Sequence, residues 1–104
     1  MRLALAIVLA AWTLGASAQE VLNERQLLGM RLFNQSCRVC HTKPQPTSEQ
    51  YGPPLSRAAA GGNDDAMRVF ISNGTAKMPG FRYHFKPAEI DAIVAYLKTI
   101  PSPD

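Results

Sequence analysis

The pattern of apolar and polar positions divides the chain into a leader and three amphipathic segments. From Leu3 to Leu14 almost every residue is apolar. Further on, apolar residues recur at helical spacing within residues 24–35, 63–73 and 87–100. No stretch shows the strict alternation of a half-buried strand. The pattern therefore predicts a single all-α domain, made of a few helices joined by loops.

The leader has the features of a secretory signal peptide. Met1 and Arg2 supply a positive start, and residues 16–18 read Ala-Ser-Ala, a typical cleavage signature. The apolar run between them is shorter than the roughly 20 residues that a membrane-spanning helix needs. We expect residues 1–18 to be removed and a mature domain of residues 19–104 to be exported to the periplasm, without stable membrane insertion.

The first predicted helix has a clear start signal. Asn23 can accept hydrogen bonds from the free amides of the first turn, and Gln26 lies where its side chain can reach back to Asn23. Leu28 and Leu32 then repeat at the spacing of one helical face. The helix should run from about residue 24 to residue 35, directly into the next segment of interest.

Start and stop residues also bound the two later helices. Asn63 is a capping residue followed by two acids, which the helix dipole favours, and Asn-Gly at residues 73–74 supplies a left-handed stop. Pro87 suits the first position of the last helix, and Pro101 ends it. Residues 42–62 are rich in Pro, Ser, Gln and Gly, so they predict a long irregular loop.

The chemistry of the chain is concentrated in residues 37–41, which read Cys-Arg-Val-Cys-His. Cysteines at i and i+3 lie on one side of a helical turn, so both sulfurs can reach the vinyl groups of one porphyrin while the following histidine binds its iron. A redox-active pair and half of a zinc site are the alternatives. The first is typical of a βαβ context, and the second needs further ligands although only His84 remains. The motif favours thioethers at Cys37 and Cys40 and an iron ligand at His41.

The small size of the domain supports a bound cofactor. A domain this small gains little stability from an apolar core alone, and a disulfide between Cys37 and Cys40 would close too short a loop to help. A flat apolar cofactor would complete the core, and the long loop could wrap around it.

The net charge of the chain does not favour nucleic-acid binding. It is +3, and it falls by one when Arg2 is removed with the signal peptide, so the mature domain is close to neutral.

An iron held by one histidine has a sixth position, and its occupant decides between electron transfer and ligand chemistry. Met78 lies in a predicted loop between two helices, where an unbranched thioether can reach a metal. Met30 and Met67 fall within predicted helices, and we assign them to core packing. His84 is the alternative ligand and would give a site of lower potential. We expect Met78.

Together these residues resemble the small bacterial class I cytochromes c over residues 19–104. In chain order, the resemblance rests on Gly29, Phe33, the motif at residues 37–41, Gly52 to Leu55, Met78 to Gly80, Tyr96 and Leu97. It implies a cytochrome c fold, in which three to four helices and long loops wrap around one covalently attached haem c with its iron.

The resemblance also implies roles for individual residues. The carbonyl of Pro53 would accept a hydrogen bond from the ring of His41 and fix its tautomer. Leu55 would pack on the face of the porphyrin, and Gly29 would let the first helix cross the last one closely. The family pattern does not identify the partners of the haem propionates, for which the candidates are Tyr51, Arg57 and Tyr83.

A haem with both axial positions filled predicts a one-electron carrier rather than an enzyme. Lys77, Arg82 and Lys86 surround the methionine, where they either form a positive rim for an acidic redox partner or are simply solvated. The partner would be a periplasmic dehydrogenase or a terminal oxidase or reductase. Two alternatives stay open: a cytochrome subunit of a periplasmic dehydrogenase complex, and a haem enzyme or gas-binding protein with a labile sixth ligand.

Overall fold

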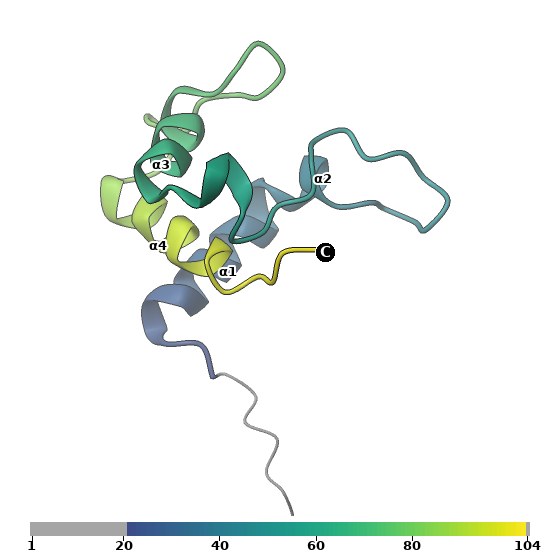
Figure 1. The fold of residues 1–104 in the computed structure, drawn as a ribbon. Coiled ribbons are helices and arrows are strands. Elements are labelled where there is room, and N and C mark those ends of the chain that lie inside the picture. The colour runs from purple at the N-terminus through teal and green to yellow at the C-terminus, as the bar shows by residue number, and fades with distance from the viewer. Residues whose placement is uncertain (1–20, 104) are drawn as a thin grey trace, which may run out of the picture.

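The computed structural model describes residues 21–103, so the predicted signal peptide of residues 1–18 lies outside the described residues. In chain order the elements are α1 (Glu24–Ser36), α2 (Arg38–His41), the 3-10 helix η1 (Ala59–Gly62), α3 (Asp64–Asn73) and α4 (Pro87–Leu97) (Figure 1). Over residues 21–103 the β-structure amounts to one isolated bridge between Thr75 and Met78. The predicted all-α architecture is confirmed.

The start of α1 is the predicted capping box. The side chain of Asn23 accepts a hydrogen bond from the amide of Gln26 at 2.8 Å, and the side chain of Gln26 accepts one from the amide of Asn23 at 2.9 Å. α1 ends at Ser36, where Cys37 with φ −109° and ψ −35° separates it from α2. α1 thus ends one residue beyond the predicted end at about residue 35, although neither glycine nor proline marks the break.

The later helices begin where they were predicted to begin. Asn63 caps α3 by accepting a hydrogen bond from the amide of Ala66 at 2.9 Å, and Pro87 is the first residue of α4. The ends differ in detail. Gly74 has φ +69° with ψ −168°, so it stops α3 without adopting the expected left-handed helical conformation. α4 ends at Leu97, and Lys98 lies just beyond its last turn.

The long loop before α3 closes in an unusual backbone conformation. Ala60, Gly61 and Gly62 all have positive φ, at 51°, 69° and 74°. The ammonium group of Lys98 donates to the carbonyl of Gly62 at 2.9 Å and lies 3.0 Å from a carboxylate oxygen of Asp64. These contacts from the end of α4 hold the turn against the helices.

The crossing of α1 over α4 forms the centre of the fold. At Gly29 the two backbones approach so closely that a Cβ atom there would overlap the carbonyl oxygen of Ala92 and lie 2.9 Å from the Cβ of Tyr96. One turn further along α1, the ring of Phe33 packs against the ring of Tyr96 with centroids 5.5 Å apart. The close approach that the resemblance implied is therefore present.

The buried core comes from α1, α3, α4 and the segment that leads into α4. Its apolar members are Leu32, Phe33, Cys37, Met67, Ile71, Phe85, Ile90, Ala92, Ile93, Val94 and Leu97. Leu28 shares the predicted face of α1 with Leu32, but it lies at the rim with 38% of its surface exposed. Met67 is a core residue, as its helical position predicted.

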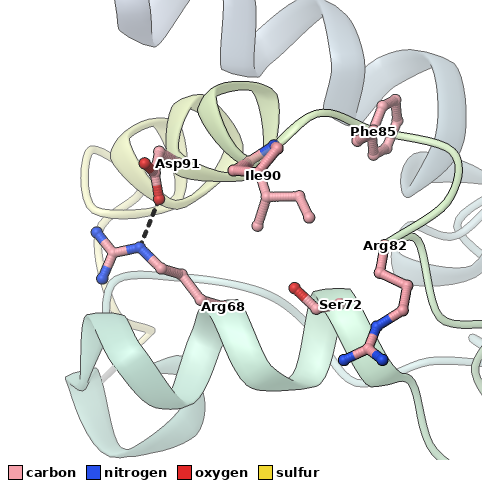
Figure 2. Close-up of a pocket in the computed structure, with 7 residues that line it drawn as sticks. Arg68, Ser72, Arg82, Phe85, Ile90 and Asp91 are labelled. Atoms are coloured by element: carbon pink, nitrogen blue, oxygen red, sulfur yellow. Dashed lines mark hydrogen bonds and ion pairs between the residues drawn. The ribbon is translucent and has the colours of Figure 1, made fainter.

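An ion pair joins α3 to α4. Arg68 donates from Nε to Asp91 at 2.6 Å, as Figure 2 shows, and from Nη1 to Asp65 at 2.7 Å. The hydrogen bond to Asp91 is the main reason why the pKa of Arg68 is raised. A pocket of about 180 Å³ beside this pair is lined by Arg68, Ser72, Arg82, Phe85, Pro87, Ile90 and Asp91. None of the predicted haem-binding residues lines this pocket. We therefore assign the ion pair beside it to the packing of α3 against α4.

Candidate haem site

The two cysteines lie at the junction of α1 and α2. Cys37 is 7% exposed and belongs to the core, whereas Cys40 is half-buried, and the two do not form a disulfide. The amides of Cys40 and His41 donate to the carbonyl of Cys37 at 3.2 Å and 3.1 Å. The segment is therefore one helical turn, and this turn carries both sulfur atoms on the same side.

The surroundings of Cys37 favour an uncharged sulfur atom. Burial raises the pKa of the Cys37 thiol to about 11, and the neighbouring Cys40 adds to this rise. A redox-active cysteine acts as a thiolate, which this position disfavours. A thioether carries no charge. The buried position of Cys37 thus fits covalent attachment of an apolar cofactor better than a redox-active pair.

A hydrogen bond fixes the ring of His41. Its Nδ1 lies 2.7 Å from the carbonyl oxygen of Pro53. A carbonyl can only accept, so Nδ1 carries the proton and donates it, which leaves the lone pair of Nε2 available for a metal. This is the contact that the resemblance implied for Pro53. The tautomer suited to binding iron is therefore set by the chain itself.

The loop after α2 is built closely around His41. The amide of Gly52 donates to the carbonyl of Cys40 at 2.6 Å, and a Cβ atom at Gly52 would lie 2.9 Å from the His41 ring. The side chain of Gln50 donates to the carbonyls of His41 and Gly52, at 2.9 Å and 2.8 Å. Gln50 is not predictable from the sequence, because an amide side chain in a polar loop carries no signal that distinguishes it from a solvated one.

Met78 lies half-buried in the loop between α3 and α4. Thr75 and Met78 exchange two backbone hydrogen bonds, at 2.9 Å and 3.3 Å, so the methionine ends a tight turn. This loop and the one after α2 both project beyond the helices (Figure 1). Tyr51 connects them, because its hydroxyl group donates to the carbonyl of Lys77 at 3.2 Å. Tyr51, a candidate propionate partner from sequence, thus contacts the residue that precedes Met78.

The remaining predicted residues occupy different environments. Leu55 is partly buried and packs against the hydrophobic core. His84 is exposed, and its ring packs edge-on against Phe85 with centroids 4.6 Å apart. Arg57 and Tyr83 are both exposed. Of the two candidate sixth ligands, Met78 is the one whose neighbour is linked to the loop that orients His41.

Comparison with known proteins identifies the family. The sequence profile described as cytochrome C oxidase, cbb3-type, subunit III, matches residues 24–97. The chain belongs to this family. As a c-type cytochrome it carries covalently bound haem c with iron, and Cys37, Cys40 and His41 fit the attachment motif. No curated protein sequence matches this cytochrome significantly.

Solved structures show the same fold. Dihydro-heme d1 dehydrogenase NirN in complex with DHE is 29% identical over 74% of the cytochrome, with a TM-score of 0.59, and the cytochrome spans 17% of that chain. Cytochrome c6 from the diatom Phaeodactylum tricornutum is 23% identical, with 69% and 88% of the two chains covered and a TM-score of 0.53. Cytochrome c6C from Synechococcus sp. PCC 7002 is 22% identical, with 67% and 89% covered and a TM-score of 0.53. The predicted class I cytochrome c fold is confirmed.

Proposed function

We propose that this cytochrome is a periplasmic one-electron carrier, with haem c attached at Cys37 and Cys40 and with His41 and Met78 as axial ligands. The observation that carries the proposal is the 2.7 Å hydrogen bond from His41 to Pro53, because it prepares one ring nitrogen for iron. Haem c supplies a one-electron couple at its iron. The chain attaches the haem and holds the two ligands.

The residues around the site keep their positions through contacts of their own. Pro53 orients the ring of His41, and Gln50 ties the backbone of His41 to that of Gly52. Leu55 supplies apolar surface next to the core. The neutral sulfur of Met78 favours the ferrous state and raises the potential compared with a second histidine. Filled axial positions leave no site for a substrate at the iron, so a haem with both ligands in place suits an electron carrier.

Replacing Met78 tests the ligand assignment. We expect Met78→Ala to lose the weak far-red absorption band that methionine sulfur gives to ferric haem. The reduction potential should fall on the order of 100 mV, a fraction of the roughly 0.8 V that axial ligands span. The reduced variant should also bind carbon monoxide at neutral pH, which the unmodified cytochrome should not. Absorption spectroscopy and redox titration measure these changes.

Two matched variants complete this test. Met30→Ala removes a half-buried methionine from α1 and should leave the far-red band in place. His84→Ala should also leave it in place, because His84 is an exposed side chain that packs against Phe85. An unchanged spectrum in Met78→Ala, together with an altered one in His84→Ala, would assign the sixth position to histidine. Carbon monoxide binding by the unmodified protein would favour the enzyme or gas-binding alternative.

The proposed location rests on the leader. The leader has the features of a secretory signal peptide. In the part of the chain that the structure describes, no helix combines the length and the apolar character needed to cross a membrane. We expect the partners to be a periplasmic dehydrogenase or a terminal oxidase or reductase, and we expect docking to use the exposed basic residues Lys77, Arg82 and Lys86.

The salt dependence of oxidation rates tests the proposed docking role of Lys77, Arg82 and Lys86 without requiring the natural partner. The rate of oxidation by ferricyanide, a small anion, should fall on the order of tenfold as the Debye length shortens from about 30 Å to about 3 Å. The rate of oxidation by the cation tris(1,10-phenanthroline)cobalt(III) should rise instead. Lys77→Gln and Lys86→Gln should weaken both trends, whereas Lys43→Gln, in the other loop, should not. Stopped-flow absorption measures the rates, and salt-independent rates would dismiss the docking role.

The match to NirN favours a second candidate function, in which the cytochrome is the electron-accepting subunit of a periplasmic dehydrogenase complex. NirN is a dehydrogenase chain of which this cytochrome spans 17%, so a domain of this fold forms part of a larger redox enzyme there. Size-exclusion chromatography of a native periplasmic extract separates the two candidates. A free carrier elutes at the size of the mature domain, and a subunit elutes together with dehydrogenase activity.

A further inference from the structure

We propose that Tyr51 is a positioning residue for Met78, which it holds through a hydrogen bond to the carbonyl of Lys77. This inference rests on the proposed function, in which Met78 is an iron ligand. The segment concerned is residues 74–82, here called the methionine loop. Its position depends on contacts at its base, within its turn and at its tip.

The base of the methionine loop is bound to the end of α3. The amide of Phe81 donates to the carbonyl of Ile71 at 2.9 Å, and the amide of Arg82 donates to the carbonyl of Ser72 at 3.2 Å. The side chain of Arg82 adds a hydrogen bond to Asn73 at 2.7 Å. These contacts fix where the loop leaves and rejoins the helical body, but they lie away from its tip.

The turn at the tip is internally bonded. Besides the two backbone hydrogen bonds between Thr75 and Met78, the amide of Lys77 donates to the hydroxyl oxygen of Thr75 at 3.2 Å. Residues 75–78 are therefore tied to one another. A displacement of the carbonyl of Lys77 would carry Met78 with it.

Tyr51 supplies the contact that the base and the turn do not provide. Within residues 21–103, its hydrogen bond to Lys77, at 3.2 Å, is the one that ties residues 75–79 to a segment outside the methionine loop. The anchor itself is firm, because Tyr51 lies between Gln50 and Gly52, which bind the backbone of His41 and Cys40. The hydroxyl group of Tyr51 thus couples the loop that orients the histidine to the loop that carries the methionine.

The expected effect of this contact is modest. The side chain of Tyr51 is 70% exposed, so water competes for the carbonyl of Lys77. A hydrogen bond of this kind changes an equilibrium constant about two- to fivefold. Without it, the methionine loop should swing more freely about its base, and an external ligand should displace Met78 from iron more easily.

The test uses the haem-loaded protein and two variants, each of which lacks one hydroxyl group. In Tyr51→Phe, the apparent dissociation constant for imidazole, measured by loss of the far-red band of the ferric protein, should fall about two- to fivefold. Hydrogen exchange at the amides of residues 75–78 should become faster, while exchange within α3 stays unchanged. Thr47→Val is the control, because it removes an exposed hydroxyl group from the same loop, and it should behave like the unmodified protein in both measurements.

Each outcome separates this inference from the proposed function. If the unmodified protein lacks the far-red band, the assignment of Met78 fails, and the role of Tyr51 fails with it. If the band is present but Tyr51→Phe binds imidazole and exchanges its amides like the unmodified protein, only the positioning role is overturned. A shifted potential with unchanged imidazole binding would also overturn it, and would point to a contact of Tyr51 with a haem propionate.

Discussion

Replacing Gly29 with alanine is expected to lower the free energy of unfolding by about 2–3 kcal/mol, although alanine is the better helix former by about 1 kcal/mol. The added Cβ atom would overlap the carbonyl oxygen of Ala92 and lie 2.5 Å from its carbonyl carbon. A backbone carbonyl inside α4 cannot rotate aside, so the two helices must separate. The packing of Phe33 against Tyr96 would then loosen as well.

Urea unfolding followed by circular dichroism measures this loss. Gly61→Ala serves as the control, because a Cβ atom there would meet no atom within 4 Å, although the φ of +69° disfavours alanine. This variant should lose only about 1 kcal/mol, the usual cost of a side chain in that backbone conformation. If Gly29→Ala unfolds at the same urea concentration as the parent, the close crossing of α1 and α4 does not require glycine at position 29.

The second large effect is expected from removing both attachment points. The variant Cys37→Ala, Cys40→Ala should lose covalent haem and, once haem-free, should show no cooperative unfolding transition. A domain of this size draws little stability from its own apolar core, and a bound cofactor stabilises only the folded state. The alanine at position 37 would also remove buried volume next to Phe33 and Leu32.

A pyridine haemochrome spectrum, intact mass and thermal unfolding together test this expectation. The mass of the exported parent protein also reports the number of haems and shows whether the mature chain starts at Gln19. Ser36→Ala, in the residue before Cys37, should retain covalent haem and a cooperative transition. A cooperative transition in the haem-free double variant would mean that the helices form a stable domain without their cofactor.

Local chemistry made much of this fold predictable. The capping box at Asn23, the cap at Asn63 and the proline at the start of α4 each depend on residues a few positions apart, and all three are present. The spacing of Cys37, Cys40 and His41 is local in the same way, since one helical turn brings them together. Patterns of this kind can be recognised in the sequence because the interacting residues are close together along the chain.

Contacts between distant segments were less predictable. Pro53 lies 12 residues from His41, and only the resemblance to known cytochromes indicated that they meet. Gln50 and the contact of Tyr51 with Lys77 depend on how two loops lie in space, which no local pattern records. Ala60 has a φ of +51° although alanine disfavours this conformation, and it packs against the hydrophobic core.

The paired base of the methionine loop has a consequence for how such a cytochrome can be redesigned. The main-chain amides of residues 81 and 82 donate to the carbonyls of residues 71 and 72, so these two hydrogen bonds do not depend on particular side chains. Gly74 and Gly80 must be kept, because a Cβ atom at either position would lie within 2.8 Å of backbone atoms. The other positions of the intervening segment can therefore be exchanged. Grafting a different sequence between the same two main-chain contacts would retune the iron centre while leaving the cysteine attachment motif untouched.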